Sequence, residues 1–488
     1  MVHYLERLLG VNGLAMKMEN MIGQAISTLK GNQYTLTELK YQGRLGAIYV
    51  ESTGKYLVKI YDPTGDAQQD QLLENRIRHF MKAGMPPHFA AVLDIIAEPY
   101  TGYVLERVPD GYIPLSRFLG WGQDRPFAEW YNDYRGLRGR VFVGYMLAKA
   151  FGDLGRQGYS FCSFPEDSVF IRIDQNAGIL MADIDSLYVA SIVDHTITGE
   201  SKYLAPEVVE RLRNPDILSD SFTLASILYS LLRACPPDGM GVPEGEKQVD
   251  SGKALIDTEL GSISSLAPSV VMTKRLEELF LKCFDGGKLG RMARPTPRDF
   301  EFALLDASNK LICCKSCGAW HFPRKDSTSK EFEPCPWCGA PSKPKYRLNF
   351  YNQLFIGGSV EQALDDTGDL RKLTNVYILR ENDKNIIKNA YVMDLGTSND
   401  GLIPSEDYMC FPCTSKGCFA YNPFGKEGIW VRAAADKKWR ALGNNEQFQL
   451  HRFDMVFFTF GDEDKNTMVM DGDTYKYARM AVLVEEEA

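Results

Sequence analysis

Two short cysteine pairs, Cys314-Lys-Ser-Cys317 and Cys335-Pro-Trp-Cys338, constrain the fold of this chain more than any other feature of its sequence. Each pair is followed by Gly-Ala, so the same turn occurs twice, and glycine permits the tight backbone that such a turn needs. Two thiolates from each turn form the ligand set of a closed, structural zinc site. We expect residues 311–345 to form a zinc ribbon whose metal supplies most of its folding free energy, of the order of 10 kcal/mol.

The remaining cysteines give weaker signals. Cys313 and His321 lie close to the first pair, and we interpret His321 as a packed or surface histidine. Cys410, Cys413 and Cys418 have no matching second pair, so free thiols are the favoured interpretation and a second metal site is the alternative. The odd total of eleven cysteines in a long chain fits reduced thiols in the cytoplasm better than a secreted disulfide scaffold.

Length and charge exclude several classes of protein. A chain of 488 residues is too long for one ordinary domain. Its net charge of -9 gives no basic footprint for DNA or RNA. No stretch is apolar for long enough to span a bilayer, and the N-terminus lacks the pattern of a signal peptide. We therefore expect a cytoplasmic multidomain protein that binds neither nucleic acid nor membrane.

The hydrophobic pattern predicts a multidomain α+β protein. Residues 1–30 are expected to form short amphipathic helices. Residues 31–108 read as β-strands with one helix at 66–84, and residues 109–308 read as mainly helical with a few short strands. After the ribbon, residues 346–488 contain strand-like runs separated by Gly, Asn and Asp turns, which predicts an all-β sandwich.

Two glycines and three charged residues between residues 34 and 183 are candidate binding residues. Gly43 and Gly46 lie between two strand-like runs, and Lys59 follows inside the next run. A buried lysine needs a carboxylate partner, and Glu74 on the following helical segment is the expected one. With Asp183, in Met-Ala-Asp-Ile-Asp-Ser, these residues resemble the nucleotide site of protein kinases, which implies that Asp183 binds magnesium. The alternatives are ordinary hairpin glycines and a surface lysine on an edge strand.

Three later motifs resemble the C-terminal lobe of a protein kinase. Ala205-Pro206-Glu207 is similar to the Ala-Pro-Glu that closes the kinase activation segment, and Asp220 begins a helix similar to the one whose Asp caps the catalytic-loop backbone. Arg294-Pro-Thr is similar to the segment whose arginine pairs with that glutamate. The resemblance implies a bilobal protein-kinase-like fold and a structural Glu207–Arg294 ion pair.

The segment aligned with the kinase catalytic loop has lost its chemistry. Ser163 and Ser168 stand where the resemblance places the catalytic Asp and the metal-binding Asn. A serine hydroxyl is not a base near neutral pH and is a poor magnesium ligand. Substitution by Glu166 or Asp167 after a register shift is the alternative. The expected nucleotide-binding residues are Gly43, Gly46, Lys59, Glu74 and Asp183.

Together, the motifs of residues 34–340 resemble a group of bacterial Hanks-type Ser/Thr kinases with a C-terminal zinc ribbon, the tellurite-resistance-associated type. The resemblance implies ATP and magnesium as ligands, and PP2C phosphatase or von Willebrand A-domain proteins as partners in a bacterial signalling system. Three functions stay open: a pseudokinase scaffold that binds nucleotide, an active atypical Ser/Thr kinase or related transferase, and a nucleotide-free protein-interaction module.

The C-terminal β region resembles a forkhead-associated domain in two places. The turn at 392–401 is similar to the Asp-Leu-Gly-Ser-x-Asn-Gly turn of that family, and residues 450–461 are similar to its late strand. However, Ile356-Gly357-Gly358 stands where Gly-Arg is expected, and no Ser-x-x-His follows. A forkhead-associated-like domain with a degenerate phosphothreonine site and an unrelated protein-binding β-sandwich are the two alternatives.

Overall fold

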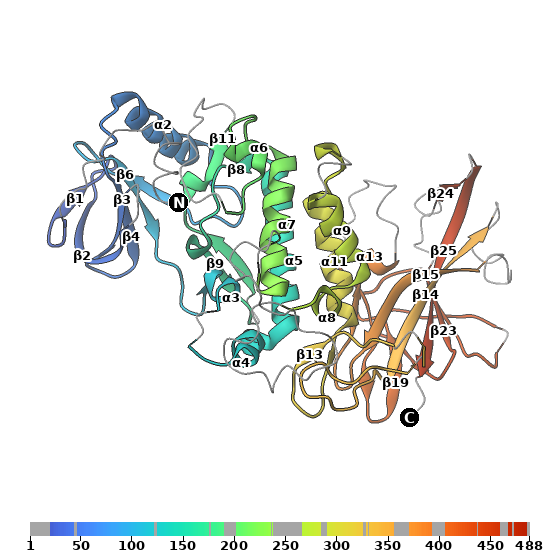
Figure 1. Ribbon diagram of the computed structural model, residues 1–488. Coiled ribbons are helices and arrows are strands. Elements are labelled where there is room, and N and C mark those ends of the chain that lie inside the picture. Colours follow the sequence, from blue (N-terminus) through green and yellow to red (C-terminus); the bar gives the residue numbers. More distant parts are fainter. Residues whose placement is uncertain are drawn as a thin grey trace.

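The chain folds into a multidomain α+β protein with several antiparallel sheets (Figure 1). The computed structural model describes residues 20–42, 46–121, 124–174, 177–189, 202–235, Pro237, 266–284, 290–325, 328–329, 331–355, 370–392, 406–436, 438–458, 467–470 and 473–485. Among the described helices, none combines the length and the apolar character that crossing a bilayer requires.

The first part of the described chain is a six-stranded antiparallel sheet in the order β1-β2-β3-β4-β6-β5. Helix α2 (Ala67–Ala83) lies where the sequence predicts a helix and contacts β5 and β6. The six strands are β1 (Ala25–Ser27), β2 (Gln33–Gln42), β3 (Gly46–Glu51), β4 (Tyr56–Tyr61), β5 (Val92–Ile95) and β6 (Gly102–Glu106).

The N-terminal segment differs from the helical prediction where it is described. Strand β1 lies inside residues 1–30 and pairs with β2, with Ile26 opposite Tyr34. Ile26 alternates with exposed neighbours and is buried in the same cluster as Leu36, which is the pattern of a half-buried strand. Gly23 turns the chain just before the strand with a φ of 89°, a conformation that favours glycine. The helices expected in residues 1–19 lie outside the described residues.

A helical region follows, built around three long helices, α5, α7 and α11. Helix α5 contacts both α7 and α11, and Gly144 of α5 permits this approach because a Cβ there would lie 3.0 Å from Leu228. Asp216 and Thr296 begin α7 and α11 with capping boxes. The helices are α3 (Ser116–Leu119), α4 (Phe127–Asn132), α5 (Gly136–Arg156), α6 (Pro206–Val209), α7 (Ile217–Arg233), α8 (Pro268–Val271), α9 (Lys274–Phe284) and α11 (Pro297–Lys310).

Short strands and 3-10 turns lie among these helices, and Glu166, Asp167 and Ser168 lie in one of the turns. Strands β9 and β10 pair antiparallel, as do β8 and β11. The strands are β7 (Ile113–Pro114), β8 (Tyr159–Phe161), β9 (Val169–Arg172), β10 (Gly178–Met181) and β11 (Leu187–Val189), and the turns are η1 (Asp133–Arg135), η2 (Glu166–Ser168), η3 (Ile184–Ser186) and η5 (Arg291–Ala293).

The C-terminal region contains two antiparallel sheets that bury one common core. Leu348 and Leu483 from the first sheet share this core with Met409 and Leu450 from the second. The first sheet has the order β15-β14-β25-β23-β20-β21, with β24 on β25, and the second has the order β16-β17-β19-β18, with β22 on β19. The elements are β14 (Tyr346–Phe355), β15 (Leu370–Leu379), β16 (Ile386–Lys388), α13 (Asn389–Val392), β17 (Asp407–Cys410), β18 (Cys413–Thr414), β19 (Gly417–Tyr421), β20 (Ile429–Arg432), β21 (Arg440–Ala441), β22 (Gln447–Leu450), β23 (Met455–Phe458), β24 (Thr467–Met470) and β25 (Asp473–Glu485).

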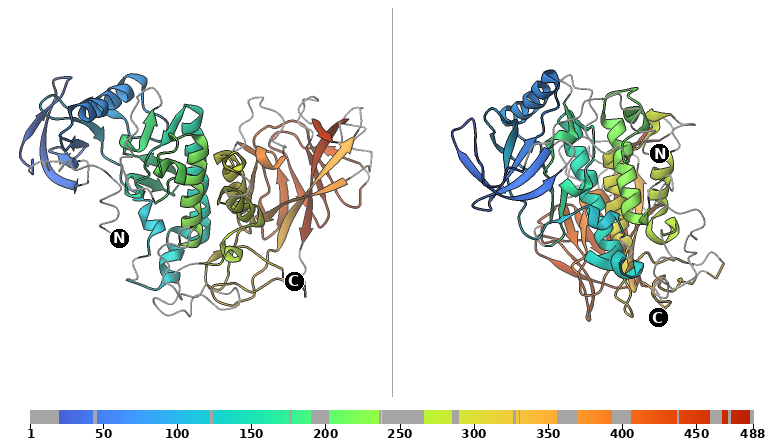
Figure 2. Two further views of the ribbon diagram at one scale, coloured as in Figure 1. Left: turned by 45° about the horizontal axis from the view of Figure 1, so that its top comes forward. Right: turned by 60° about the vertical axis from the view of Figure 1, so that its left-hand side comes forward.

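Helix α11 joins the helical region to these two sheets. Figures 1 and 2 show α11 between α5 and the orange and red strands of the C-terminal region. Leu305 of α11 packs against the core of the two sheets, and the Arg380 guanidinium donates to the Ser308 carbonyl at 3.2 Å. Helix α11 therefore contributes side chains to two hydrophobic cores. The forkhead-associated-like turn at 392–401 lies outside the described residues except for Val392, whereas residues 450–458 of the second motif are described and include β23.

One cysteine prediction is wrong. Cys413 and Cys418 form a disulfide where free thiols were expected, whereas Cys410 is a buried free thiol. The two bonded residues face each other across the β18–β19 hairpin, with Cα atoms 4.3 Å apart. Cross-strand partners of this kind are brought together by the turn itself. None of the three belongs to a metal-ligating cluster in the part of the chain that the structure describes.

Candidate functional site: a four-cysteine cluster and a buried ion pair

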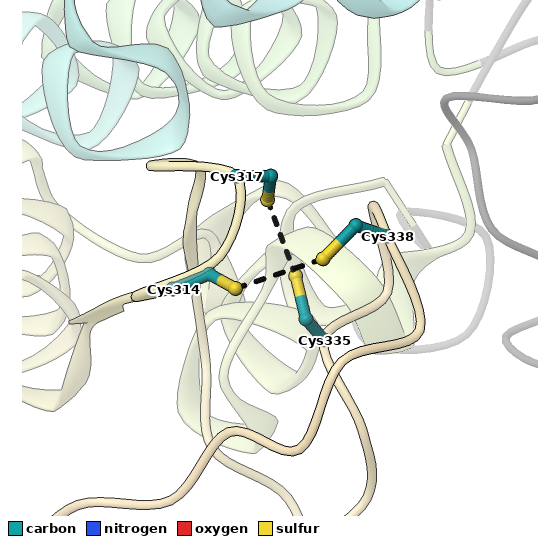
Figure 3. Close-up of side chains that lie close together, drawn as sticks. All are labelled: Cys314, Cys317, Cys335 and Cys338. Atoms are coloured by element: carbon teal, nitrogen blue, oxygen red, sulfur yellow. Dashed lines mark hydrogen bonds between the residues drawn. The ribbon is translucent and has the colours of Figure 1, made fainter.

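Cys314, Cys317, Cys335 and Cys338 point toward one centre (Figure 3). The Sγ atoms of Cys314 and Cys338 are 3.7 Å apart, those of Cys317 and Cys335 are 3.8 Å apart, and all four lie within 4.8 Å of one another. Four thiolates about 2.3 Å from a tetrahedral zinc ion stand about 3.8 Å from each other. The cluster can therefore hold one metal ion such as zinc.

Two matching backbone turns position these four thiols. The Gly318 N–H donates to the Cys314 carbonyl and the Gly339 N–H to the Cys335 carbonyl, each at 2.9 Å. Both glycines have positive φ angles, 74° and 71°, which L-side chains rarely adopt. Burial raises the pKa of the Cys335 thiol, and it also raises that of Cys317 to about 11. Burial acts in the same direction on Cys314, but hydrogen bonds from backbone N–H groups outweigh it and lower its pKa to about 7.

Neither neighbour of the first pair joins the cluster. Cys313 is exposed, and its thiol faces the Gly318 carbonyl. His321 is 1% exposed, and its Nε2 lies 2.9 Å from the Ser342 hydroxyl. Burial lowers the pKa of His321, which favours the neutral imidazole. His321 is therefore a packed histidine, one of the two options left open by the sequence.

The cysteine-bearing region is packed against the helical region. Trp337, between the second pair of cysteines, is 2% exposed and stacks on Tyr131 of α4 with ring centroids 5.4 Å apart. Trp320 of β13 (Trp320–His321), which pairs with β12 (Ile312–Cys313), lies under the Arg138 guanidinium of α5, 4.4 Å from its ring centroid. Cys314, Cys335 and Trp337 belong to the same hydrophobic core as the helices. Sequence reasoning missed this contact, whose one local signal was a tryptophan between two cysteines.

The second candidate site is an ion pair between segments far apart in the chain. Lys59 Nζ of β4 lies 2.7 Å from Asp183 Oδ1, just after β10. Lys59 is 9% exposed, and its ammonium is 5.1 Å from the ring centroid of Tyr61 and 5.9 Å from that of Tyr103. A carboxylate and two aromatic rings thus compensate the burial of the ammonium.

The expected ion pair between Lys59 and Glu74 does not form. Glu74 instead accepts a hydrogen bond at 2.9 Å from Arg78 Nε, one turn later on the same helix. Residues four apart on a helix lie on one face, so Arg78 reaches Glu74 without any movement of α2. The inward face of α2 is occupied by Ile77 and Phe80, which are buried in the core.

Only one of the two candidate glycines lies in the described residues. Gly43 falls outside them. Gly46 begins β3, and a Cβ added there would lie 2.1 Å from the Ile60 carbonyl oxygen of β4. Gly46 is therefore required by close packing of β3 on the strand that carries Lys59, whatever else it does.

The segment with Ser163 and Ser168 is held firmly beside Asp183. The Cys162 N–H donates to the Ser186 carbonyl at 2.8 Å, and the Ala182 N–H donates to the Ser168 carbonyl at 2.9 Å. Ser163 is buried and Ser168 is half-buried. These bonds hold the loop that contains the two serines against the segments on either side of Asp183.

The two acidic residues of the same loop are differently placed. Glu166 Oε1 accepts a hydrogen bond from Lys202 Nζ at 2.6 Å, while Asp167 is exposed. Lys202 precedes Ala205 by three residues, so this ion pair links the loop to the segment before α6. The carboxylate nearest to Ser163 in the sequence is therefore engaged by a lysine.

Glu207 is the centre of an arginine network. Arg294 donates to both of its carboxylate oxygens, at 2.5 and 3.1 Å, and Arg291 donates at 2.9 Å. Burial alone would raise the pKa of Glu207, but the hydrogen bonds from the two arginines outweigh it and hold the pKa below its ordinary value. Ala205 is buried, and Pro206 occupies the first turn of α6. The network ties α6 to the residues before α11.

Asp220 of α7 holds the backbone before Ser163. Its Oδ1 accepts a hydrogen bond from the Phe161 N–H at 2.9 Å. Asp220 is 2% exposed, and this burial raises its pKa to about 8, although hydrogen bonds from Phe161 and Ser160 oppose the shift. Asp220 is therefore a structural carboxyl group that fixes β8 on α7.

Comparison with known proteins adds no family to these observations. No known protein-family model matches the chain, and no curated protein resembles its sequence closely enough to count as a relative.

Proposed function

We propose that this protein is a kinase-like scaffold that binds a nucleotide near Lys59 and Asp183 and lacks efficient phosphoryl transfer. The observation that carries the proposal is the ion pair across 124 residues of sequence, which brings one cation and one carboxylate together from two parts of the fold. An ammonium is suited to a nucleotide phosphate, and a carboxylate is suited to the accompanying magnesium.

The missing transferase activity is inferred from the loop beside this pair. Ser163 and Ser168 supply neither a base nor a strong magnesium ligand. Glu166, the nearest substitute in the sequence, is held by Lys202. The Glu207–Arg294 pair and the Asp220 cap support a kinase-like framework, because the resemblance assigns them structural roles only.

Nucleotide binding is tested by thermal unfolding with ATP and magnesium. A ligand at a hundred times its dissociation constant stabilises the folded state by about 2.7 kcal/mol. We expect stabilisation of the unaltered protein, loss of it in Lys59→Ala, and its retention in Lys55→Ala. Lys55 is an exposed lysine just before β4 and serves as the matched control. Stabilisation that persists in Lys59→Ala would place the nucleotide elsewhere.

Incubation with labelled ATP separates the scaffold from an active atypical kinase. We expect no incorporation of label into the protein or into a general acceptor protein. Incorporation that disappears in Lys59→Ala would overturn the scaffold proposal in favour of transferase activity.

A second candidate is a nucleotide-free interaction module. It is favoured by the closeness of Lys59 to Asp183, because each charge already satisfies the other, and a nucleotide would have to separate them. No thermal stabilisation by ATP and magnesium, in the unaltered protein, is the result that this candidate predicts.

The remaining parts of the proposal concern placement and partners. We propose zinc as the metal of the cysteine cluster, since four thiolates with this spacing suit it. The two C-terminal sheets are proposed as a protein-binding domain, forkhead-associated-like or unrelated, in a cytoplasmic bacterial signalling system. Phosphatase or von Willebrand A-domain partners are tested by copurification with the full chain, and their absence from the complexes would remove that part of the proposal.

A further inference from the structure

A cavity of about 360 Å³ lies where the cysteine-bearing region meets the helical region. Its wall includes Glu129 and Asn132 of α4, Arg135 of η1, and Cys317, Trp320 and Trp337 from the cysteine-bearing region. Ligand pockets in proteins span roughly 300–1,000 Å³, so this volume suits a single long side chain or a small molecule. The cavity is separate from the Lys59–Asp183 pair and independent of the proposed function.

The two indole rings are held in place from outside the cavity. The Arg138 guanidinium covers Trp320, and Tyr131 stacks on Trp337, and neither of these supporting residues belongs to the cavity wall. Rings fixed in this way lose little side-chain entropy when a ligand binds. Indole is also the aromatic group that attracts organic cations most strongly.

The polar groups of the wall include acceptors without partners. Glu129 is exposed and forms no ion pair with any described residue. Asn132 Oδ1 is buried and accepts no hydrogen bond in the described part of the chain. This oxygen lies against Gly136, where a Cβ would be 2.7 Å from it, and the Asn132 amide donates to the Ala128 carbonyl at 2.8 Å.

The charge at the cavity comes from Glu129 and from nearby arginines. The Glu129 carboxylate is an anion of the wall, and the Arg138 guanidinium lies over Trp320 from outside the wall. Arg135 is the one cation that borders the cavity, and it is exposed. A ligand cation would therefore be attracted by Glu129 and repelled by Arg135, so the two residues should affect affinity in opposite directions.

We propose that this cavity binds an alkylammonium or guanidinium group, attracted by the indole ring of Trp320 and by the Glu129 carboxylate. Such a group can come from a lysine or arginine side chain of a partner protein or from a free small amine. An uncharged alkyl chain of the same length would lack both the ring attraction and the charge pair with Glu129.

The test uses the full chain labelled with fluorotryptophan and observed by fluorine NMR. The chain has six tryptophans, and the Trp320 and Trp337 signals are assigned with Trp320→Phe and Trp337→Phe. The probes are butylammonium, a blocked Ala-Ala-Lys-Ala-Ala peptide, and the same peptide with norleucine in place of lysine. We expect the two cations to shift the Trp320 signal to saturation and the norleucine peptide to leave it unchanged.

Charge variants decide whether the cavity is responsible. Glu129→Gln should weaken lysine-peptide binding by about fivefold, as for one partly exposed charge pair, and Arg135→Gln should strengthen it. Glu210→Gln, which removes an exposed carboxylate after α6, is the matched control and should change nothing. If the signals of tryptophans far from position 129 are the same in Glu129→Gln as in the unaltered protein, the fold of the variant is intact.

The outcomes either support or overturn the proposal. Peptide binding about tenfold tighter than butylammonium binding supports a partner side chain as the source, and equal affinities support a free amine. Equal shifts with the norleucine peptide, no shift with about 50 mM of either cation, or unchanged affinity in Glu129→Gln would each overturn it.

Discussion

The four-cysteine cluster and the Lys59–Asp183 pair differ in the groups that they bring together. The cluster places four thiols of one kind within 4.8 Å of one another, a set that can hold one metal ion. The ion pair brings together one cation and one anion at 2.7 Å, with two aromatic rings around the ammonium. The two charges of the pair already compensate each other. We therefore expect a ligand to be structural at the first site and optional at the second.

The largest effect should follow removal of the metal or of one cysteine. In Cys335→Ser, or after chelation, the two turns lose the ion that joins them, at a cost of several kcal/mol out of the order of 10 kcal/mol that such sites supply. Trp337 should then leave Tyr131, and tryptophan emission should shift to the red as the ring becomes exposed. Thermal unfolding and fluorescence measure both effects.

The adjacent thiol provides a control for this experiment. Cys313 is exposed and outside the cluster, so Cys313→Ser should leave both the unfolding temperature and the emission maximum unchanged. If Cys335→Ser behaved like Cys313→Ser, packing alone would hold the region together, and the contrast between the two sites would disappear.

A smaller effect is expected from breaking the ion pair. Lys59→Met or Asp183→Asn leaves the opposite charge partly buried, which should cost about 2 kcal/mol of unfolding free energy. The double variant should cost less than the sum of the two, because no charge is then left unpaired. Denaturant unfolding of the four proteins gives the coupling energy, and simple additivity would show that the pair is not self-compensating.

Trp337→Phe tests how much of the docking of the cysteine-bearing region comes from packing. The indole N–H has no hydrogen-bond partner among the described residues, so its removal offsets part of the lost ring contact. We expect a loss of only about 1 kcal/mol and full retention of the metal. Metal analysis of the purified variant checks this expectation, and loss of metal together with the indole would mean that the contact with Tyr131 shapes the cluster.

The last prediction concerns pH. Asp220 has a pKa raised to about 8 in the folded protein from an ordinary value of 3.8, so its contribution to stability is present below about pH 4 and is lost as pH rises toward 8. Asp220→Asn can still accept the bond from Phe161 and does not titrate. As pH rises across this range, the unaltered protein should therefore lose unfolding free energy relative to Asp220→Asn. A difference that stays constant with pH would contradict the raised pKa of Asp220.

Local patterns in the sequence were enough to predict the four-cysteine cluster and the strand or helix character of segments such as β4 and α2. Each cysteine turn is specified by residues that are neighbours in the chain, such as Cys314 and Gly318. The spacing of apolar residues likewise predicted a strand at β4 and a helix at α2. Strand β1 was missed because three residues are too few to show a period, and its partner β2 decides its conformation.

Contacts between distant segments were harder to predict. Glu74 was the expected partner on the helix after Lys59, but Asp183 reaches Lys59 in space and Arg78 pairs with Glu74. The Trp337–Tyr131 contact joins residues in different regions and leaves no periodic signal. For Cys413 and Cys418, the hairpin register decides the pairing, and composition pointed toward free thiols instead. The catalytic and partner assignments rest on resemblance and stay predictions.

The position of the cysteine-bearing region has a consequence for the life of the protein in a cell. Its residues contact the helices through Trp337, and Lys315 forms an ion pair with Glu381 of the two-sheet region at 3.0 Å. A chain synthesised during metal shortage would lose this bridge and present an unfolded loop to proteases. Its abundance would then follow the supply of metal, and recovery of the folded protein after starvation would require new synthesis wherever degradation had outpaced metal uptake.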